Sequence, residues 1–232
     1  MLQQTQTGRV TEKFLNFTEK FPNFFVLSNA PLDEVLKMWQ GLGYNRRAIA
    51  IKKIAEIVIN EYNGQLPDSV EILKSFPQIG HNTASSIITF AFNKPTLFIE
   101  TNIRRVYIYF FFPGKNNIRD KDIAPILEKT MDKDNPREWY YALMDYGVML
   151  KKRFPNLNKR SAHYRKQAKF KGTNRQIRGK LLRMIIKYKS IALADIEKKL
   201  KDSSIERIRT ILSQLEKEGF LRIKDELIQI VQ

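Results

Sequence analysis

The sequence predicts an all-α body over residues 1–150, followed by a small C-terminal α+β domain of the winged-helix kind. Two observations support this fold class. Apolar residues recur at helical spacing through the body, which is broken by Pro, Gly and polar clusters, with no alternation of strands and helices. After residue 171, helical patterns resume and end in two short alternating segments, typical of a hairpin.

The helices of the body follow from these breaks. Phe14, Phe17 and Phe21 mark the apolar stripe of the first helix, and Pro31 stands at the favoured first position of the second. The short apolar run Leu97-Phe98-Ile99 is expected to be extended. We expect helices over residues 5–21, 31–40, 46–62, 69–75, 81–92, from about 101, 120–131 and 136–150.

The remaining chain divides into a linker and a small domain. Residues 151–171 read as a polar, basic linker or loop, and residues 172–232 as the winged-helix-like domain. Three helices and a hairpin around Asp225-Glu226 give that domain its order. The third helix would read a DNA groove with Arg207 and Arg209, although many winged helices bind protein instead. The expected domains are therefore 1–150, 151–171 and 172–232.

Composition narrows the function classes. The chain has no cysteine and two histidines, which excludes disulfides, thiolate nucleophiles and cysteine-held zinc or iron–sulfur sites. We therefore expect no metal and no cofactor. No apolar run approaches the roughly 18 residues of a membrane span, and the first residues do not have the pattern of a signal peptide. The expectation is a cytoplasmic, nucleoid-associated protein that works as a monomer away from membranes.

The charge indicates a polyanionic partner. The formal net charge is +17, from 41 Lys and Arg against 24 Asp and Glu. Residues 151–171 carry nine basic residues and no acidic one, so the excess is concentrated rather than spread. Double-stranded DNA is the expected partner, and Lys151, Lys152 and Arg153 are expected to contact its phosphates.

A hairpin between two helices supplies a second indication of DNA binding. The turn Phe76-Pro77-Gln78-Ile79-Gly80 lies between a short helix and a helix beginning near His81. Such a turn presents backbone N–H groups beside a helix N-terminus, an arrangement that suits a DNA phosphate. Gln78, Gly80, Asn82 and Thr83 are the expected contact residues.

Taken together, these motifs resemble the helix-hairpin-helix DNA glycosylase superfamily, in particular the adenine-mismatch glycosylases and, more distantly, endonuclease III. The resemblance covers roughly residues 1–150. The matching stretches are 1–6, 36–48 with Trp39-Gln40-Gly41-Leu42-Gly43-Tyr44, the hairpin, 98–106, and more weakly 142–147.

The resemblance implies a role for several residues. Gln3 and Gln4 resemble the wedge that fills the gap left by a flipped base, and Tyr44 resembles the residue that intercalates beside the estranged base. Glu100 stands where the family has its catalytic aspartate, just before a helix start. A carboxylate fixed there can stabilise an oxocarbenium-like sugar or activate water. The alternative is that Glu100 only complements the helix dipole and Arg104.

The sequence also departs from the family. Asn82 replaces the Schiff-base lysine of bifunctional members, so no lyase activity is expected. The cysteines that hold the family's iron–sulfur cluster would be expected between about residues 151 and 167, and they are absent. The family's general-acid glutamate lies upstream of the segment that matches residues 1–4. Gln78 replaces the first glycine of the hairpin and fits only if the backbone avoids, or tolerates, a positive φ there.

Three functions fit these observations. The first is a monofunctional DNA glycosylase of base-excision repair that hydrolyses the N-glycosidic bond of a mismatched base, with adenine as the expected target. The second is a thymine or uracil mismatch glycosylase on the same scaffold. The third is a non-catalytic DNA-binding protein that has kept the hairpin and the winged helix.

Overall fold

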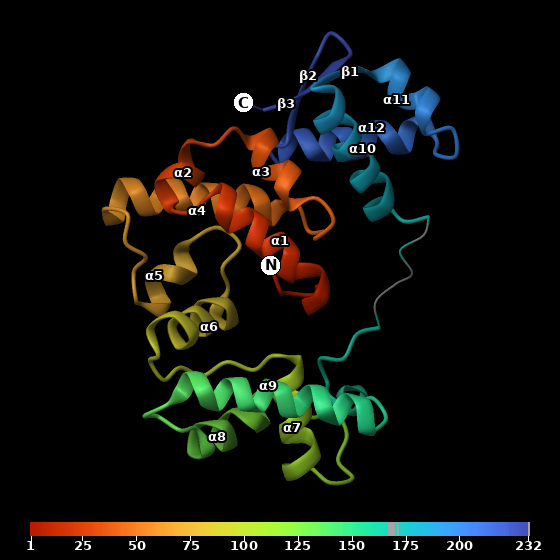
Figure 1. Ribbon diagram of the computed structural model, residues 1–232. Helices are drawn as coiled ribbons and strands as arrows, with labels where there is room; N and C mark the ends of the chain where they lie inside the picture. Colours follow the sequence, from red (N-terminus) through yellow and green to blue (C-terminus); the bar gives the residue numbers. More distant parts are fainter. Residues whose placement is uncertain (167–169, 171, 232) are drawn as a thin grey trace. The chain divides into compact units, whose positions relative to one another are not determined.

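The computed structural model describes residues 1–166, 170 and 172–231 (Figure 1). These residues form two compact units. The first combines residues 1–66 with the described residues of 168–232, and the second contains those of 67–167. The expected domain boundaries at residues 150 and 171 were drawn from the sequence pattern, whereas these two units are defined by packing. The expected boundaries therefore stay a prediction. Within the described ranges, no helix has both the length and the apolar character needed to span a membrane.

The first unit is built from both ends of the chain around one apolar core. Buried Leu36 and Trp39 of the N-terminal segment belong to the same core as Leu181 and Leu212 of the C-terminal segment. Its elements are α1 (Thr7–Lys20), α2 (Phe24–Asn29), α3 (Leu32–Trp39), α4 (Arg46–Tyr62), α10 (Asn174–Tyr188), β1 (Ser190–Ala192), α11 (Leu193–Lys199), α12 (Ile205–Lys217), β2 (Leu221–Lys224) and β3 (Leu227–Ile230).

The C-terminal part of this unit carries a small antiparallel sheet. The strand order is β1-β3-β2, with Ser190 opposite Gln229 and Leu221 opposite Ile230. Asp225 and Glu226, with φ of 49° and 58°, form the turn between β2 and β3, as the type I′ hairpin geometry requires. Three helices with a hairpin confirm the predicted fold class, and β1 is an additional strand that the sequence pattern did not predict.

The second unit is helical. Its core includes Tyr107, Ile123, Leu127 and Tyr140, all fully or almost fully buried. Its elements are α5 (Val70–Ser75), α6 (His81–Phe92), α7 (Thr101–Phe111), α8 (Asp120–Thr130), α9 (Pro136–Arg153) and the short 3-10 helix η1 (Leu157–Arg160). Helices α7 and α9 pack closely at Gly147, where an added Cβ would lie 2.5 Å from the carbonyl oxygen of Asn102.

Three local expectations need correction. Helix α2 was not predicted, because six residues between two prolines are too short for an apolar period, although the Asn23 side chain caps it. The Leu97-Phe98-Ile99 run is irregular rather than a strand. The expected linker is partly folded, since residues 151–153 complete α9 and residues 157–160 form η1. Residues 167–169 and 171 of that expected linker lie outside the described residues.

Candidate active site

Glu100 occupies the N-cap of α7. One carboxylate oxygen, Oε1, accepts hydrogen bonds from the backbone N–H groups of Asn102 at 2.7 Å and of Ile103 at 3.0 Å. The other oxygen, Oε2, makes no hydrogen bond to any described residue. An acidic N-cap is favourable because the first amides of a helix lack intrahelical partners and carry partial positive charge. The carboxylate is therefore fixed through one oxygen and available through the other.

The segment before Glu100 is held by Tyr140 of α9. The Tyr140 hydroxyl donates to the carbonyl of Thr96 at 2.8 Å and accepts the N–H of Phe98 at 3.3 Å, and its ring stacks on that of Phe98 at 4.1 Å. Burial raises the pKa of Tyr140 to about 12, so the hydroxyl keeps its proton and remains a donor. This packing fixes the approach to Glu100 without a β-strand.

Two asparagine side chains donate hydrogen bonds to the carbonyls of the residues before and after Glu100. Asn82 Nδ2 donates to the carbonyl of Ile99 at 3.1 Å, and Asn158 Nδ2 donates to the carbonyl of Thr101 at 3.1 Å. Asn82 was expected to contact DNA, and its side chain is already engaged within the protein. Asn158 was missed, because an asparagine within a basic run carries no motif and its partner lies 57 residues away.

The charges around Glu100 do not neutralise it by direct pairing. Arg104 forms a two-bond ion pair with Asp120, at 2.7 and 2.8 Å, rather than with Glu100 as the sequence alternative supposed. Arg105 is buried and donates to Asn102 Oδ1 and to the carbonyl of Gly147, each at 2.7 Å. Burial lowers the pKa of Arg105, and the negative charge of Glu100 acts in the opposite direction.

The hairpin forms as expected between α5 and α6. Ser69 caps α5, and Gly80 is the N-cap of α6, where it offers no side chain to the first amides of the helix. Gln78 has a φ of +61°, so the turn does require the left-handed backbone that glycine adopts more easily. Gln78, Gly80 and Asn82 are exposed, and Thr83 is half-buried. The backbone of the turn is therefore accessible to a phosphate.

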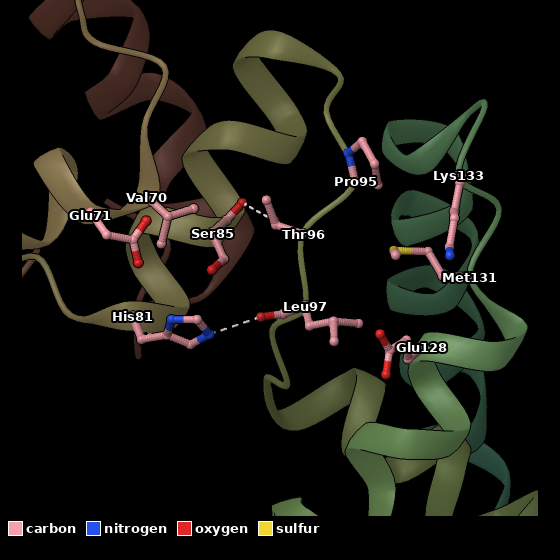
Figure 2. Close-up of a pocket in the computed structure, with 10 residues that line it drawn as sticks. All are labelled: Val70, Glu71, His81, Ser85, Pro95, Thr96, Leu97, Glu128, Met131 and Lys133. Carbon is pink, nitrogen blue, oxygen red and sulfur yellow. Dashed lines mark hydrogen bonds between the residues drawn. The ribbon is translucent and has the colours of Figure 1, made fainter.

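A shallow pocket lies beside the hairpin helix (Figure 2). It is lined by Val70, Glu71, His81, Ser85, Pro95, Thr96, Leu97, Glu128, Met131 and Lys133. His81 Nε2 lies 3.1 Å from the carbonyl oxygen of Leu97, and the Thr96 hydroxyl donates to the carbonyl of Ser85 at 2.7 Å. These contacts tie the segment before Glu100 to α6, and Glu100 itself is not part of the lining.

In the first unit, the two expected DNA wedges meet. Gln4 and Tyr44 both have positive φ, of 57° and 48°, and the Tyr44 hydroxyl donates to Gln4 Oε1. The Tyr44 side chain is 46% exposed, which leaves its ring accessible. Arg47 was not predicted, yet it donates to the carbonyl of Gln3 at 3.0 Å and stacks 5.2 Å from the Tyr44 ring centre. Arg47 therefore joins the two loops.

The expected phosphate-contacting residues have different surroundings. Lys151, Lys152 and Arg153 are exposed on the last turn of α9, and none of them forms an ion pair with another described residue. Arg207 is less available, because it donates to Asn174 Oδ1 at 2.6 Å and to the carbonyl of Gly172 at 2.8 Å. Arg209 is exposed and lies 3.7 Å from Glu197.

The donor set for a metal is poor. The sequence contains no cysteine, and in the described part of the chain no three acidic or histidine side chains are arranged to hold a metal ion.

Comparison with known families decides the membership of this chain. The profile described as "HhH-GPD superfamily base excision DNA repair protein" matches residues 1–133, which include the wedge, the hairpin and Glu100. The chain belongs to the HhH-GPD superfamily. The resemblance inferred from the motifs is thereby confirmed.

Relatives named adenine DNA glycosylase match more than half of the chain. The chain is 38% identical over 154 residues to the adenine DNA glycosylase of Buchnera aphidicola subsp. Baizongia pistaciae, covering 65% of this chain and 43% of the relative. It is 29% identical over 202 residues to that of Mycobacterium tuberculosis H37Rv, covering 78% of this chain and 66% of the relative. The chain thus spans less than half the length of the first relative.

Two solved structures share the fold of part of the chain. A thermostable thymine-DNA glycosylase matches with a TM-score of 0.55 and 24% identity, over 64% of this chain and 70% of the other. A trapped covalent intermediate of endonuclease III with DNA matches with a TM-score of 0.55 and 22% identity, over the same shares of each chain. At these identities the likeness shows the fold alone.

Proposed function

We propose that this chain is a monofunctional DNA glycosylase of base-excision repair that releases a mismatched adenine by hydrolysing its N-glycosidic bond. The observation that carries the proposal is the Glu100 carboxylate, held at the N-terminus of α7 inside the region that matches the superfamily. Relatives named adenine DNA glycosylase support adenine as the base. The target base is a proposal because the chain spans only part of those relatives.

Glu100 would supply the negative charge that the reaction requires. As the bond from base to sugar breaks, positive charge develops on the sugar, and a fixed carboxylate stabilises it or takes a proton from the attacking water. The cap through Oε1 fixes the carboxylate, and Oε2 has no partner among the described residues. Because the carboxylate is already oriented, little reorganisation is needed when the charge develops.

Residues of both units would hold the duplex and the extruded base. The backbone of the hairpin, at Gln78 and Gly80, would bind a phosphate next to the N-terminus of α6. The exposed Tyr44 ring and the Gln4 amide would fill the step from which the base is flipped. Lys151, Lys152 and Arg153 would add phosphate contacts that do not depend on sequence.

Lyase activity is not part of this proposal. The position of the family's Schiff-base lysine holds Asn82, whose amide nitrogen is not a nucleophile and donates to Ile99. We expect the abasic site to be left intact, without strand cleavage and without a cofactor.

The test is base release from defined duplexes. The full chain is incubated with duplexes holding A opposite 8-oxoguanine, A opposite G, T opposite G, and U opposite G, and abasic sites are counted. Glu100→Gln should abolish release of adenine while DNA affinity stays within about twofold, because Gln keeps the capping oxygen. Glu138→Gln removes the same charge from an exposed site on α9 and should leave release unchanged.

Two outcomes would contradict the proposal. Release of thymine or uracil, but not of adenine, would keep the glycosylase and change its target. Tight duplex binding without release of any base would favour the non-catalytic function.

A further inference from the structure

Residues 157–163, here called the brace, are folded onto the second unit rather than forming a free linker. The N–H of Ile118 donates to the carbonyl of Arg160 at 3.0 Å, and the N–H of Ala162 donates to the carbonyl of Ile118 at 2.9 Å. This places Ile118 and Ser161 in a parallel bridge. Ser161 is buried, so the brace is part of the packed unit.

Arg160 clamps the brace to the end of α7. Its Nε donates to the carbonyl of Lys115 at 2.7 Å, and its terminal nitrogen donates to the carbonyl of Phe112. Asn156 caps η1 by accepting the N–H of Asn158 at 3.2 Å. The start of the brace is thus fixed on both sides of Asn158, which sets the direction of that side chain.

Burial of the Asn158 side chain is energetically unfavourable in a way that packing alone does not explain. Its side chain is buried, with 6% exposure, and its Oδ1 has no hydrogen-bond partner among the described residues. A buried acceptor without a partner is unfavourable, and a small apolar residue would avoid the penalty. The compensating contact is the bond from Nδ2 to the carbonyl of Thr101, one residue beyond Glu100.

Asn158 acts on the same turn as Asn82 but from the other side. Asn82 holds the carbonyl of the Ile99–Glu100 peptide, and Asn158 holds the carbonyl of the Thr101–Asn102 peptide, whose N–H binds Glu100 Oε1. The two N–H groups that bind Oε1 follow directly, at Asn102 and Ile103. Glutamate has one more side-chain torsion than aspartate, so its carboxylate depends more on a fixed backbone for a single position.

We propose that the brace positions the Glu100 carboxylate, and that Asn158 is the positioning residue through which it acts. The catalytic consequence rests on the proposed function, whereas the structural consequence does not. Loss of the Asn158 donor should free the Thr101 peptide, loosen the N-cap and spread the carboxylate over several positions. The effect should be local, because Arg160 and the Ile118 bridge still hold the brace.

The test uses Asn158→Asp, which keeps the shape of the side chain but removes the donor, with Asn158→Ala beside it. The matched control is Asn135→Ala, at an exposed asparagine of the same unit. Hydrogen exchange at the Asn102 and Ile103 amides is followed by NMR. Exchange there should rise about fivefold in both Asn158 variants, the factor for one ordinary hydrogen bond, while amides within α8 and α9 stay unchanged.

Single-turnover excision separates positioning from binding. If the chain releases adenine, both Asn158 variants should slow release about tenfold or more with unchanged duplex affinity. If the wild type releases no base, the proposed function fails, and hydrogen exchange still decides whether the brace holds Glu100. Normal excision in variants whose Asn102 and Ile103 amides exchange faster would overturn the positioning role.

A measurement on the wild-type protein tests the proposal even if the Asn158 variants do not fold. The side-chain amide protons of Asn158 should exchange more slowly than those of exposed Asn135. Two results would overturn the proposal that the brace positions Glu100. One is equal exchange at the two side-chain amides, and the other is unchanged backbone exchange at Asn102 and Ile103 in folded Asn158→Asp.

Discussion

At the scale of single residues, Gln78 shows a local conflict inside a functional turn. Its φ of +61° costs an L-residue about 1 kcal/mol relative to glycine. Gln78→Gly should remove that strain, and the greater freedom of glycine in the unfolded chain offsets part of the gain. We expect a net stabilisation of up to about 1 kcal/mol in urea unfolding.

Gln65 provides the matched control for this substitution. It lies in an exposed loop and is not among the described residues with positive φ. Gln65→Gly should therefore destabilise slightly, since it adds unfolded-state freedom and relieves no strain. Equal effects at the two positions would show that the Gln78 backbone is not strained.

Sequence motifs located the candidate residues but not the contacts that hold them. The residue before a helix start was identifiable at Glu100, because a carboxylate there is favoured by the partial positive charge of the helix N-terminus. Asn158 and Arg47, which hold these residues in place, were not identifiable. Each makes its hydrogen bond to a residue that is distant in the sequence rather than to a neighbour in the same helix. Such contacts depend on how elements pack, which one sequence does not show.

At the scale of elements, the long helices and the short α5 were predictable, whereas the equally short α2 was not. The expected helices at 46–62 and 81–92 agree with α4 and α6, where polar breaks and apolar period coincide. Strand β1 has three residues, which is too few for an alternation to stand out. The brace was interpreted as a linker because its charge is conspicuous, whereas its anchors are backbone groups and single polar side chains.

The crossing of α7 and α9 depends on Gly147. A Cβ there would lie 2.5 Å from the Asn102 carbonyl oxygen, and backbone cannot move away as a flexible side chain can. Gly147→Ala should therefore destabilise by about 1–3 kcal/mol in urea unfolding, as overpacking does. Gly179→Ala, in α10 with open space around it, should instead stabilise by about 0.5–1 kcal/mol. A neutral Gly147→Ala would mean that the two helices can separate at little cost.

The last turn of α9 is the element most exposed to a polyanion. Reversing the charges of Lys151, Lys152 and Arg153 should weaken binding to every duplex and flatten the dependence of log K on log salt. The slope should change by about 0.9 for each DNA phosphate that the variant no longer neutralises. Reversal of exposed Lys129 and Lys133 tests whether net charge alone produces the effect. An unchanged slope would show that the α9 terminus does not bind phosphate.

At the scale of the whole molecule, the sequence pattern indicated consecutive domains, yet the two ends of the chain share one core. Trp39 and Leu212 lie in the same buried cluster although 173 positions separate them. Apolar period shows which face of each helix is buried, but it does not show which helix covers that face. The sequence therefore did not show that the N-terminal and C-terminal segments together form the first unit, whereas most of its helices and its hairpin could be predicted.

Glu218 links the two ends of this unit by charge. It accepts from Arg46 at the start of α4 at 2.5 Å, and from Arg178 of α10, and its side chain is only 17% exposed. The Arg46 hydrogen bond, followed by Arg178, lowers the pKa of Glu218. A carboxyl whose pKa is lower in the folded state stabilises the fold above its unfolded pKa, and that stability is lost as pH falls through the folded value.

Glu218→Gln should therefore destabilise the protein by about 1 kcal/mol at neutral pH, because it removes two charge-assisted bonds and leaves Arg178 partly unpaired. The difference from wild type should shrink as the pH falls below about 4, because Glu218 is protonated first in the unfolded chain and then, at its lower pKa, in the folded chain. Urea unfolding at a series of pH values measures it, with exposed Glu206→Gln as the control. A difference that stays constant into acid would show that Glu218 acts through packing rather than through charge.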